Sequence, residues 1–250
     1  MRKKIIAGNW KMNNDILQTT ELINGITSLL TTSKVEVIIC PPHTSLYTAH
    51  QLVKNSFIKL GAQDVSLFDN GAYTGEISIS MLKSVGCEYV IVGHSERRQY
   101  HHETNEIINQ KAKKVLSAGL VPIICIGETL QEREQNITDQ VLTTQVKGVL
   151  AGLTSGEVEK SIIAYEPVWA IGTGKTATKE QAEEAHLLIR TVISQLYSSS
   201  TSEKVVIQYG GSVKPDNAKE LLSQKNIDGA LVGGAALQSR SFADIVKAMP

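Results

Sequence analysis

The sequence predicts an α/β fold, a single closed (β/α)8 barrel. Eight short runs rich in isoleucine and valine recur along the chain, with helical patterns between them. The order begins with a strand and ends with a helix, as such a barrel requires. Runs that are apolar throughout are typical of parallel strands buried on both faces. A doubly wound open sheet is the alternative that this pattern leaves open.

The eight predicted strands are spread along the whole chain. Their continuous apolar character, without strict alternation, is what favours a parallel sheet covered on both sides. They lie within residues 4–10, 35–42, 58–63, 88–94, 121–128, 161–169, 204–211 and 228–234.

The clearest predicted helix starts at Thr178. Thr178 and Gln181 have the spacing of a capping box, in which each residue satisfies a backbone N–H of the other. Apolar residues then recur at helical spacing and form one face. This face consists of Ala182, Ala185, Ile189, Val192 and Leu196, and the other helical patterns cover residues 16–30, 104–118, 137–150 and 242–249.

Length and composition favour one domain, residues 1–250. A barrel of this size is common, and the serine cluster Ser198 to Ser200 is too short for a linker. The 25 basic and 25 acidic residues give a net charge of zero. This balance argues against nucleic acid or a membrane surface as a partner held by bulk electrostatics, and a small polar ligand fits better.

The lack of a recognisable targeting signal and the pattern of cysteines predict a cytoplasmic protein. The apolar run near the N-terminus is interrupted by Asn9 and Lys11, too early for a secretory signal, and no stretch approaches the roughly 18 apolar residues of a membrane span. Cys40, Cys87 and Cys125 are odd in number and widely spaced in apolar sequence. They are expected to be buried free thiols of a reducing compartment.

Polar residues collect at the carboxyl ends of the predicted strands, where barrel enzymes carry their chemistry. Glu166 follows an apolar strand and precedes Pro167, which fixes the chain direction. A carboxylate at this apolar mouth is expected to have its pKa raised towards that of a general base. A capping or ion-paired glutamate is the alternative. Glu128 ends another predicted strand in the same way.

His94 and Lys11 are further candidates. His94 opens the motif HSERR, in which Ser95 is a plausible helix N-cap. A helix N-terminus disfavours imidazolium, so a neutral imidazole that donates a hydrogen bond is expected. Lys11 follows a buried strand, where a lysine is costly unless it is paired or faces a ligand. A structural histidine and a surface lysine are the alternatives.

Glycine-rich loops indicate a phosphate site. Gly210, Gly211 and Ser212 follow one predicted strand, and Gly233 and Gly234 follow the next. Backbone amides in two such neighbouring loops can approach an anion closely. The stretch AYEPVWAIGTGKTATKEQ, residues 164–181, matches neither a Walker A loop nor a dinucleotide fingerprint. Its glycines lie on the preceding loop, from which they could close over the same phosphate.

Six motifs together resemble the triosephosphate isomerase family. They occur in order, with compatible spacing, over essentially the whole chain. The motifs are GNWKMN (8–13), GAYTGEIS (71–78), GHSERR (93–98), CIGET (125–129), AYEPVWAIGTGKTAT (164–178) and YGGSVKPDN (209–217). The resemblance implies a TIM barrel that isomerises dihydroxyacetone phosphate and D-glyceraldehyde 3-phosphate through a cis-enediolate, in glycolysis and gluconeogenesis, without a cofactor or metal.

The resemblance also implies roles for individual residues. Glu166 is the implied base, His94 the neutral donor that polarises the carbonyl, and Asn9 and Lys11 the groups that stabilise negative charge. Glu96 is implied to be essential and hydrogen-bonded near the site. Residues 167–178 are the implied lid. The implied phosphate ligands are the amides of Gly172, Ser212, Gly233 and Gly234.

A homodimer is a further implication. In the family the loop GAYTGE reaches into the neighbouring subunit, so Thr74 is expected near the partner's pocket and Glu76 is expected to pair with Arg97 across the interface. This sequence departs from the family at His101 and His102, where the family usually has an aromatic residue and then glycine. The departure puts the local backbone geometry in question, not the chemistry.

Two other functions stay open at this point. A different phosphosugar barrel enzyme, such as an aldolase that forms a Schiff base on Lys11, would share the glycine loops. A catalytically inactive phosphosugar-binding protein would keep those loops without the base. His43, His50 and His186 are interpreted as surface or capping residues, and Cys125 as a thiol that only packs.

Overall fold

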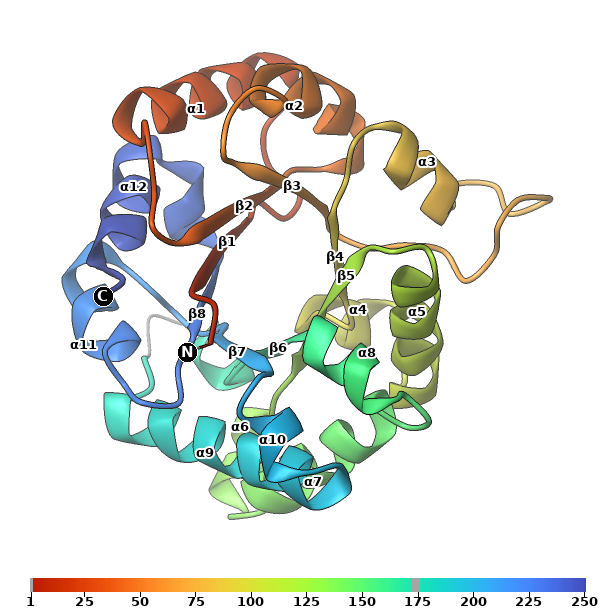
Figure 1. Ribbon diagram of the computed structural model, residues 1–250, viewed down its shortest axis with the longest axis vertical. Helices are drawn as coiled ribbons and strands as arrows, with labels where there is room; N and C mark the ends of the chain where they lie inside the picture. The colour runs from red at the N-terminus through yellow and green to blue at the C-terminus, as the bar shows by residue number, and fades with distance from the viewer. Residues whose placement is uncertain (1, 172–175) are drawn as a thin grey trace.

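The computed structural model describes residues 2–171 and 176–250, and its eight parallel strands form a closed barrel in the order of the sequence (Figure 1). All eight predicted strands are confirmed. Their bounds are β1 (Ile5–Asn9), β2 (Glu36–Cys40), β3 (Lys59–Ala62), β4 (Tyr89–Val92), β5 (Val121–Ile126), β6 (Ile162–Tyr165), β7 (Val206–Tyr209) and β8 (Gly229–Val232).

The strands are apolar throughout because both of their faces are covered. β1 pairs with β2 on one side and with β8 on the other, which closes the barrel and leaves no edge. Alternate residues point inwards: Ile5 and Ala7 belong to a core inside the barrel, whereas Ile6 belongs to the layer between strands and helices. The open-sheet alternative is therefore wrong.

Helices surround the strands and cover their outer face (Figure 1). Short 3-10 helices lie among them, at η1 (His43–Ser45), η2 (Val168–Ala170) and η3 (Gly234–Leu237). The α-helices are α1 (Ile16–Leu29), α2 (Leu46–Val53), α3 (Ile79–Ser84), α4 (Ser95–Tyr100), α5 (Asn105–Ser117), α6 (Leu130–Glu134), α7 (Thr138–Val149), α8 (Ser155–Lys160), α9 (Lys179–Leu196), α10 (Ser199–Ser202), α11 (Pro215–Leu222) and α12 (Ser239–Ala248).

The longer predicted helices are confirmed to within about a residue at their ends, as α1, α5 and α7 show. The capping box of Thr178 and Gln181 is present at the start of α9. α12 begins three residues before its predicted start at Phe242, because its first turn is polar and carries no apolar signal. Ser95 is not the N-cap of α4: His94 takes that position, and its side chain accepts a hydrogen bond from the N–H of Glu96.

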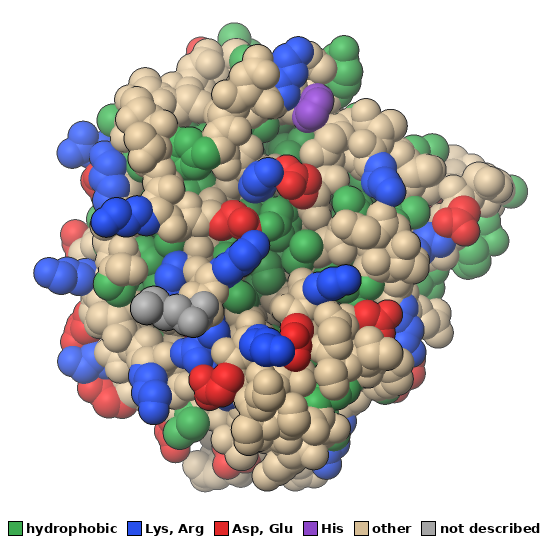
Figure 2. Space-filling view, in the orientation of Figure 1, with side chains coloured by type: hydrophobic (Ala, Val, Ile, Leu, Met, Phe, Trp, Pro, Cys, Tyr) green, Lys and Arg blue, Asp and Glu red, His purple; other side chains and the backbone are tan. Residues whose placement is uncertain are grey.

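Figure 1 views the barrel from the amino ends of its strands, with α8 and α10, which lead into β6 and β7, on the near side. On this face, charged side chains surround apolar ones near the centre (Figure 2). A cavity of about 540 Å³ lies here, lined by Ile5, Tyr89 and Ile162 among others. The polar strand ends described next lie at the opposite end of the barrel. No helix in the described part of the chain is long and apolar enough to cross a membrane.

Candidate active site

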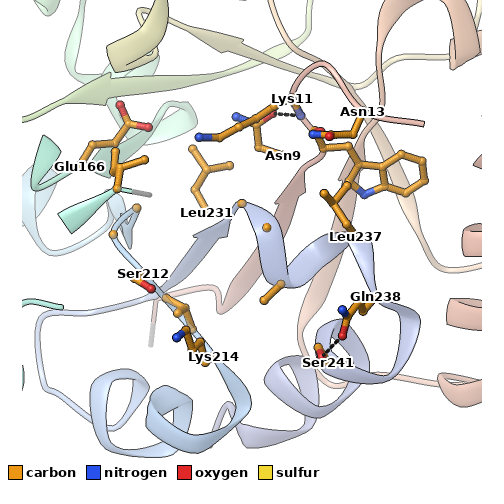
Figure 3. Close-up of a pocket in the computed structure, with 18 of the residues that line it drawn as sticks. Asn9, Lys11, Asn13, Glu166, Ser212, Lys214, Leu231, Leu237, Gln238 and Ser241 are labelled. Carbon is orange, nitrogen blue, oxygen red and sulfur yellow. Dashed lines mark hydrogen bonds between the residues drawn. The ribbon is translucent and has the colours of Figure 1, made fainter. Parts of the chain in front are cut away.

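A cavity of about 670 Å³ opens at the carboxyl ends of the strands (Figure 3). Because parallel strands all end on the same side of the barrel, residues far apart in the sequence meet there. The cavity brings together seven of the candidate residues: Asn9, Lys11, His94, Glu166, Ser212, Gly233 and Gly234.

Glu166 is held rigidly at the end of β6. Its side chain is only 2% exposed. Its backbone N–H donates to the carbonyl of Ile126 at 2.7 Å, which continues the pairing with β5. The carboxylate Oε2 accepts from the N–H of Ser95 at 2.8 Å, and Oε1 lies 2.9 Å from Nε2 of His94. The carboxylate is therefore fixed by the N-cap and the first residue of α4.

The pKa of Glu166 corrects the expectation from sequence. Burial raises this pKa, as expected, and is the largest single effect. The charge and hydrogen bond of His94, the N–H of Ser95 and the charge of Lys11 together outweigh burial. The pKa of Glu166 is therefore lowered from 4.5, and the carboxylate is ionised at neutral pH.

His94 has a defined tautomer. Its Nδ1 accepts from the N–H of Glu96 at 3.2 Å, so the proton of a neutral ring is on Nε2 and faces Glu166. Burial lowers the pKa of His94, but the charge and hydrogen bond of Glu166, with the charge of Glu96, outweigh it and raise the pKa above 6.5. The sequence analysis expected the helix N-terminus to keep the pKa of His94 low. The structure corrects this expectation, because the carboxylates of Glu166 and Glu96 raise that pKa.

Lys11 sits in a strained backbone conformation. Its φ of 53° is in the left-handed region, which is uncommon for a residue with a side chain. Its N–H donates to Oδ1 of Asn9 at 3.0 Å, and its carbonyl accepts from Nε2 of Gln63 at 2.8 Å. Its Nζ lies 2.7 Å from Oε1 of Glu96. These contacts direct the ammonium group towards Glu166 (Figure 3).

Sequence reasoning missed Gln63 and the burial of Glu128. Gln63 follows β3, so its position at a strand end was the available signal. Glu128 is completely buried. Its Oε1 accepts from the Tyr165 hydroxyl at 3.1 Å and from Nε1 of Trp169 at 2.9 Å, and it pairs with Arg133. Glu128 therefore anchors the chain on both sides of Glu166.

The glycine loops line the other side of the cavity. Gly233 is the N-cap of η3, and a Cβ added to it would lie 3.5 Å from Cε of Lys11, whereas a Cβ added to Gly234 would meet no atom within 4 Å. Ser212 lies opposite, near the start of α11 (Figure 3). Amides that line a cavity in this way suit an anion. Gly172, and with it the tip of the proposed lid, lies outside the described residues.

The three residues assigned to a dimer contact lie outside the cavity. Thr74 and Glu76 are exposed on the loop between β3 and α3, which projects from the barrel (Figure 1). Arg97 is paired within its own chain, with Asp64 at 2.8 Å and Glu103 at 2.7 Å.

Two histidine interpretations are resolved. His186 is not a surface or capping residue: it is completely buried in α9, and burial lowers its pKa to about 3. His102 has a φ of 53°, so it adopts the left-handed conformation at the position where the family usually has glycine. Cys40, Cys87 and Cys125 are buried free thiols, as predicted. No group of three or more metal-ligating side chains occurs among the residues described.

The barrel, with a buried carboxylate, a histidine, a lysine and an amide-lined pocket at one end, defines a phosphate-binding (β/α)8-barrel enzyme. The sequence model of the triosephosphate isomerase family matches residues 4–249. The chain belongs to the triosephosphate isomerase family. It is therefore an isomerase of triose phosphates.

Curated relatives named triosephosphate isomerase match nearly the full length of the chain. A triosephosphate isomerase from Dictyoglomus turgidum is 54% identical over 248 residues, 99% of this chain and 100% of the relative. One from Clostridium botulinum (strain Okra / Type B1) is 52% identical over 246 residues, 98% of this chain and 99% of the relative. One from Endomicrobium trichonymphae is 50% identical over 248 residues, 99% of both chains.

Proposed function

We propose that Glu166, His94, Lys11 and Asn9 carry out the isomerisation of dihydroxyacetone phosphate to D-glyceraldehyde 3-phosphate. The observation that carries this assignment is the position of the Glu166 carboxylate, which is buried, ionised and directed into the cavity that the other three residues line. The whole chain, residues 1–250, acts as one catalytic domain.

Glu166 moves the proton. Its carboxylate removes a proton from C1 of dihydroxyacetone phosphate, and the electron pair of that C–H bond forms the C1–C2 double bond of the enediolate. The carbonyl electrons move to the oxygen on C2. The proton of the hydroxyl on C1 passes to the oxygen on C2, Glu166 returns a proton to C2, and the carbonyl forms at C1. No proton or electron is lost, so neither a cofactor nor a redox partner is required.

His94 and Lys11 stabilise the oxygens of the enediolate. The Nε2–H of His94 donates to Glu166 when the two are in contact, and a substrate carbonyl placed between them would accept this hydrogen bond instead. The ammonium of Lys11 and the amide of Asn9 line the same cavity. Preorganised donors of this kind act most strongly where water is excluded. The ion pair of Lys11 with Glu96 favours this electrostatic role over a Schiff base.

The phosphate is held at the glycine loops by the amides of Ser212, Gly233 and Gly234. This group does not react, so its binding free energy can hold the reacting carbons in position against Glu166. Lys214 also lines this end of the cavity (Figure 3) and adds positive charge near the anion.

A homodimer is part of the proposal. Several large apolar side chains are exposed near the carboxyl ends of β1 to β4: Met12 (96%), Leu17 (67%), Tyr47 (64%), Met81 (53%) and Tyr100 (68%). Where such side chains form a contiguous patch, they mark a protein contact. In the projecting loop, Phe68 and Tyr73 stack with ring centroids 3.7 Å apart, which stiffens the segment that carries Thr74. The buried free thiols support a reducing compartment, the cytoplasm.

Proton exchange with solvent tests the proposed mechanism. In deuterium oxide, dihydroxyacetone phosphate converted by the protein should give glyceraldehyde 3-phosphate with deuterium at C2, because a carboxylate base exchanges its proton with solvent. NMR spectroscopy of the product measures this. Complete transfer of the C1 hydrogen to C2, with no deuterium incorporated, would contradict a base that exchanges its proton with solvent and would favour a direct hydride shift.

A further inference from the structure

Three rings pack together behind the base, in the layer between strands and helices. Tyr165 is the last residue of β6, Tyr209 is the last residue of β7, and His186 reaches them from α9. The ring of His186 meets Tyr165 edge-on, with centroids 5.8 Å apart and planes at 90°. Its centroid lies 6.3 Å from that of Tyr209. All three side chains are at most 1% exposed.

The plane of the His186 ring is fixed from the other side. Its Nδ1 lies 3.3 Å from the carbonyl oxygen of Asn226, which only accepts, so Nδ1 carries the proton and donates it. Asn226 is itself held, because its N–H and side-chain amide donate to Glu183 and its carbonyl also accepts from Arg190. His186 is therefore a rigid neutral ring, not a mobile or titrating one.

This three-ring cluster is connected directly to the catalytic carboxylate. Side chains alternate along a strand, so Tyr165 points outwards to His186 while the next residue, Glu166, points into the cavity. The N–H of Gly210, which follows Tyr209, donates to the carbonyl of Tyr165 at 2.6 Å. A Cβ added to Gly210 would lie 2.9 Å from Cγ of Glu166. A shift of either tyrosine would therefore move the carboxylate.

We propose that His186 is a positioning residue for the isomerisation, which acts through the rings of Tyr165 and Tyr209 to hold Glu166 at its working distance from the substrate carbon. The proposal rests on the assignment of Glu166 as the base. The ring supplies the contact with the tyrosines, and the hydrogen bond to Asn226 sets the orientation of the ring. The substrate itself is not touched, so His186 influences the proton transfer and not the binding of phosphate.

Three substitutions separate these contributions. His186→Asn keeps a donor near Asn226 and removes the ring, His186→Phe keeps a ring and removes the donor, and His186→Leu keeps much of the volume without either. Ile193→Ala is the matched control, because Ile193 is completely buried in the same helix two turns away. Each variant is assayed for kcat, KM and thermal midpoint, and for the isotope effect with dihydroxyacetone phosphate deuterated at C1.

The expected result is a fall in kcat of roughly 10- to 100-fold for Asn and Leu with little change in KM, because a displacement of about 1 Å is enough for such a loss. The isotope effect of these two variants should rise, since proton transfer becomes slower than the diffusion of substrate and product. His186→Phe should recover most of the rate. Ile193→Ala should lower the thermal midpoint and leave kcat and the isotope effect unchanged.

The outcomes are distinguishable. Wild-type kcat and isotope effect in all folded His186 variants would overturn the proposal. The proposal would also be overturned if Ile193→Ala lost kcat as much as the His186 variants do for the same fall in thermal midpoint. If the asparagine variant does not fold, the leucine and phenylalanine variants give the same comparison. An unmodified protein without isomerase activity would instead refute the assignment of the base.

Discussion

Nε2 of His94 lies 2.9 Å from Oε1 of Glu166, and the two side chains are 7% and 2% exposed. The proposed base and the proposed hydrogen-bond donor are thus each other's partner in the free protein. Each shifts the pKa of the other, with Glu166 lowered and His94 raised. A substrate placed between them replaces the hydrogen bond between His94 and Glu166 by one contact with each side chain. Both polar groups then keep a partner.

Shortening the base by one methylene tests its geometry. In Glu166→Asp the carboxylate retreats by about 1 Å while its charge is kept, so proton transfer loses alignment and kcat should fall by roughly two powers of ten. Steady-state kinetics with both substrates measure this. A nearly normal rate in a correctly folded variant would remove Glu166 from the role of base.

The His94–Glu166 pair should make stability depend on pH. The pKa of His94 is raised, so its contribution is fully present below about 6.5 and is lost as the pH rises through the folded-state pKa. The pKa of Glu166 is lowered, so its contribution is present above about 4.5 and is lost as the pH falls through the folded-state pKa.

The pair therefore stabilises the fold most between these two limits. Urea unfolding at fixed protein concentration compares the protein with His94→Gln at pH 5.5 and pH 8.5. The difference in the free energy of unfolding should be larger at the lower pH. An equal difference at both pH values would show that the two groups are not coupled in the folded state.

Gly210 should not tolerate a methyl group. An added Cβ would lie 2.9 Å from Cγ of Glu166 and 3.1 Å from the carbonyl oxygen of Tyr165, so Gly210→Ala should displace the base and lower kcat by roughly 10- to 100-fold. Gly156→Ala is the control, because its Cβ meets nothing within 4 Å in α8. That substitution should leave kcat unchanged and stabilise the fold by roughly 0.5–1 kcal/mol.

A charge on the projecting loop should separate the proposed dimer. Thr74 is exposed on that loop, so Thr74→Arg should place a long charged side chain in the interface. Sedimentation should then show a shift towards monomer, with lower activity at low protein concentration. Ser200→Arg, on the exposed surface of α10, is the matched control and should change neither quantity. An active monomer of the unmodified protein would contradict the shared interface.

The strands and the main site residues could be predicted because their signals are local. An apolar run predicts a buried strand, and the residue that follows it, such as Glu166 or Ser212, gives the polar group at the end of that strand. The barrel closure then follows from the alternation of strands and helices. Short helices such as α8 and α10 were not predicted, because six or four residues are too few to show a helical period.

Properties that depend on contacts between distant segments could not be predicted in this way. The lowered pKa of Glu166 arises from His94, Ser95 and Lys11, which other strands bring to it. The burial of His186 and Glu128 likewise depends on the neighbours that pack over them. In the sequence His186 resembles an ordinary polar residue of a surface helix, and Glu128 shows only that a carboxylate ends a strand.

Isomerase activity and its loss in one variant test the central claim most directly. The purified protein is supplied with glyceraldehyde 3-phosphate, and a coupled dehydrogenase follows the dihydroxyacetone phosphate formed. Glu166→Gln, which keeps the size of the side chain but cannot accept the proton, is run beside it. We expect rapid conversion by the protein and almost none by the variant. Equal conversion by both would show that another group is the base.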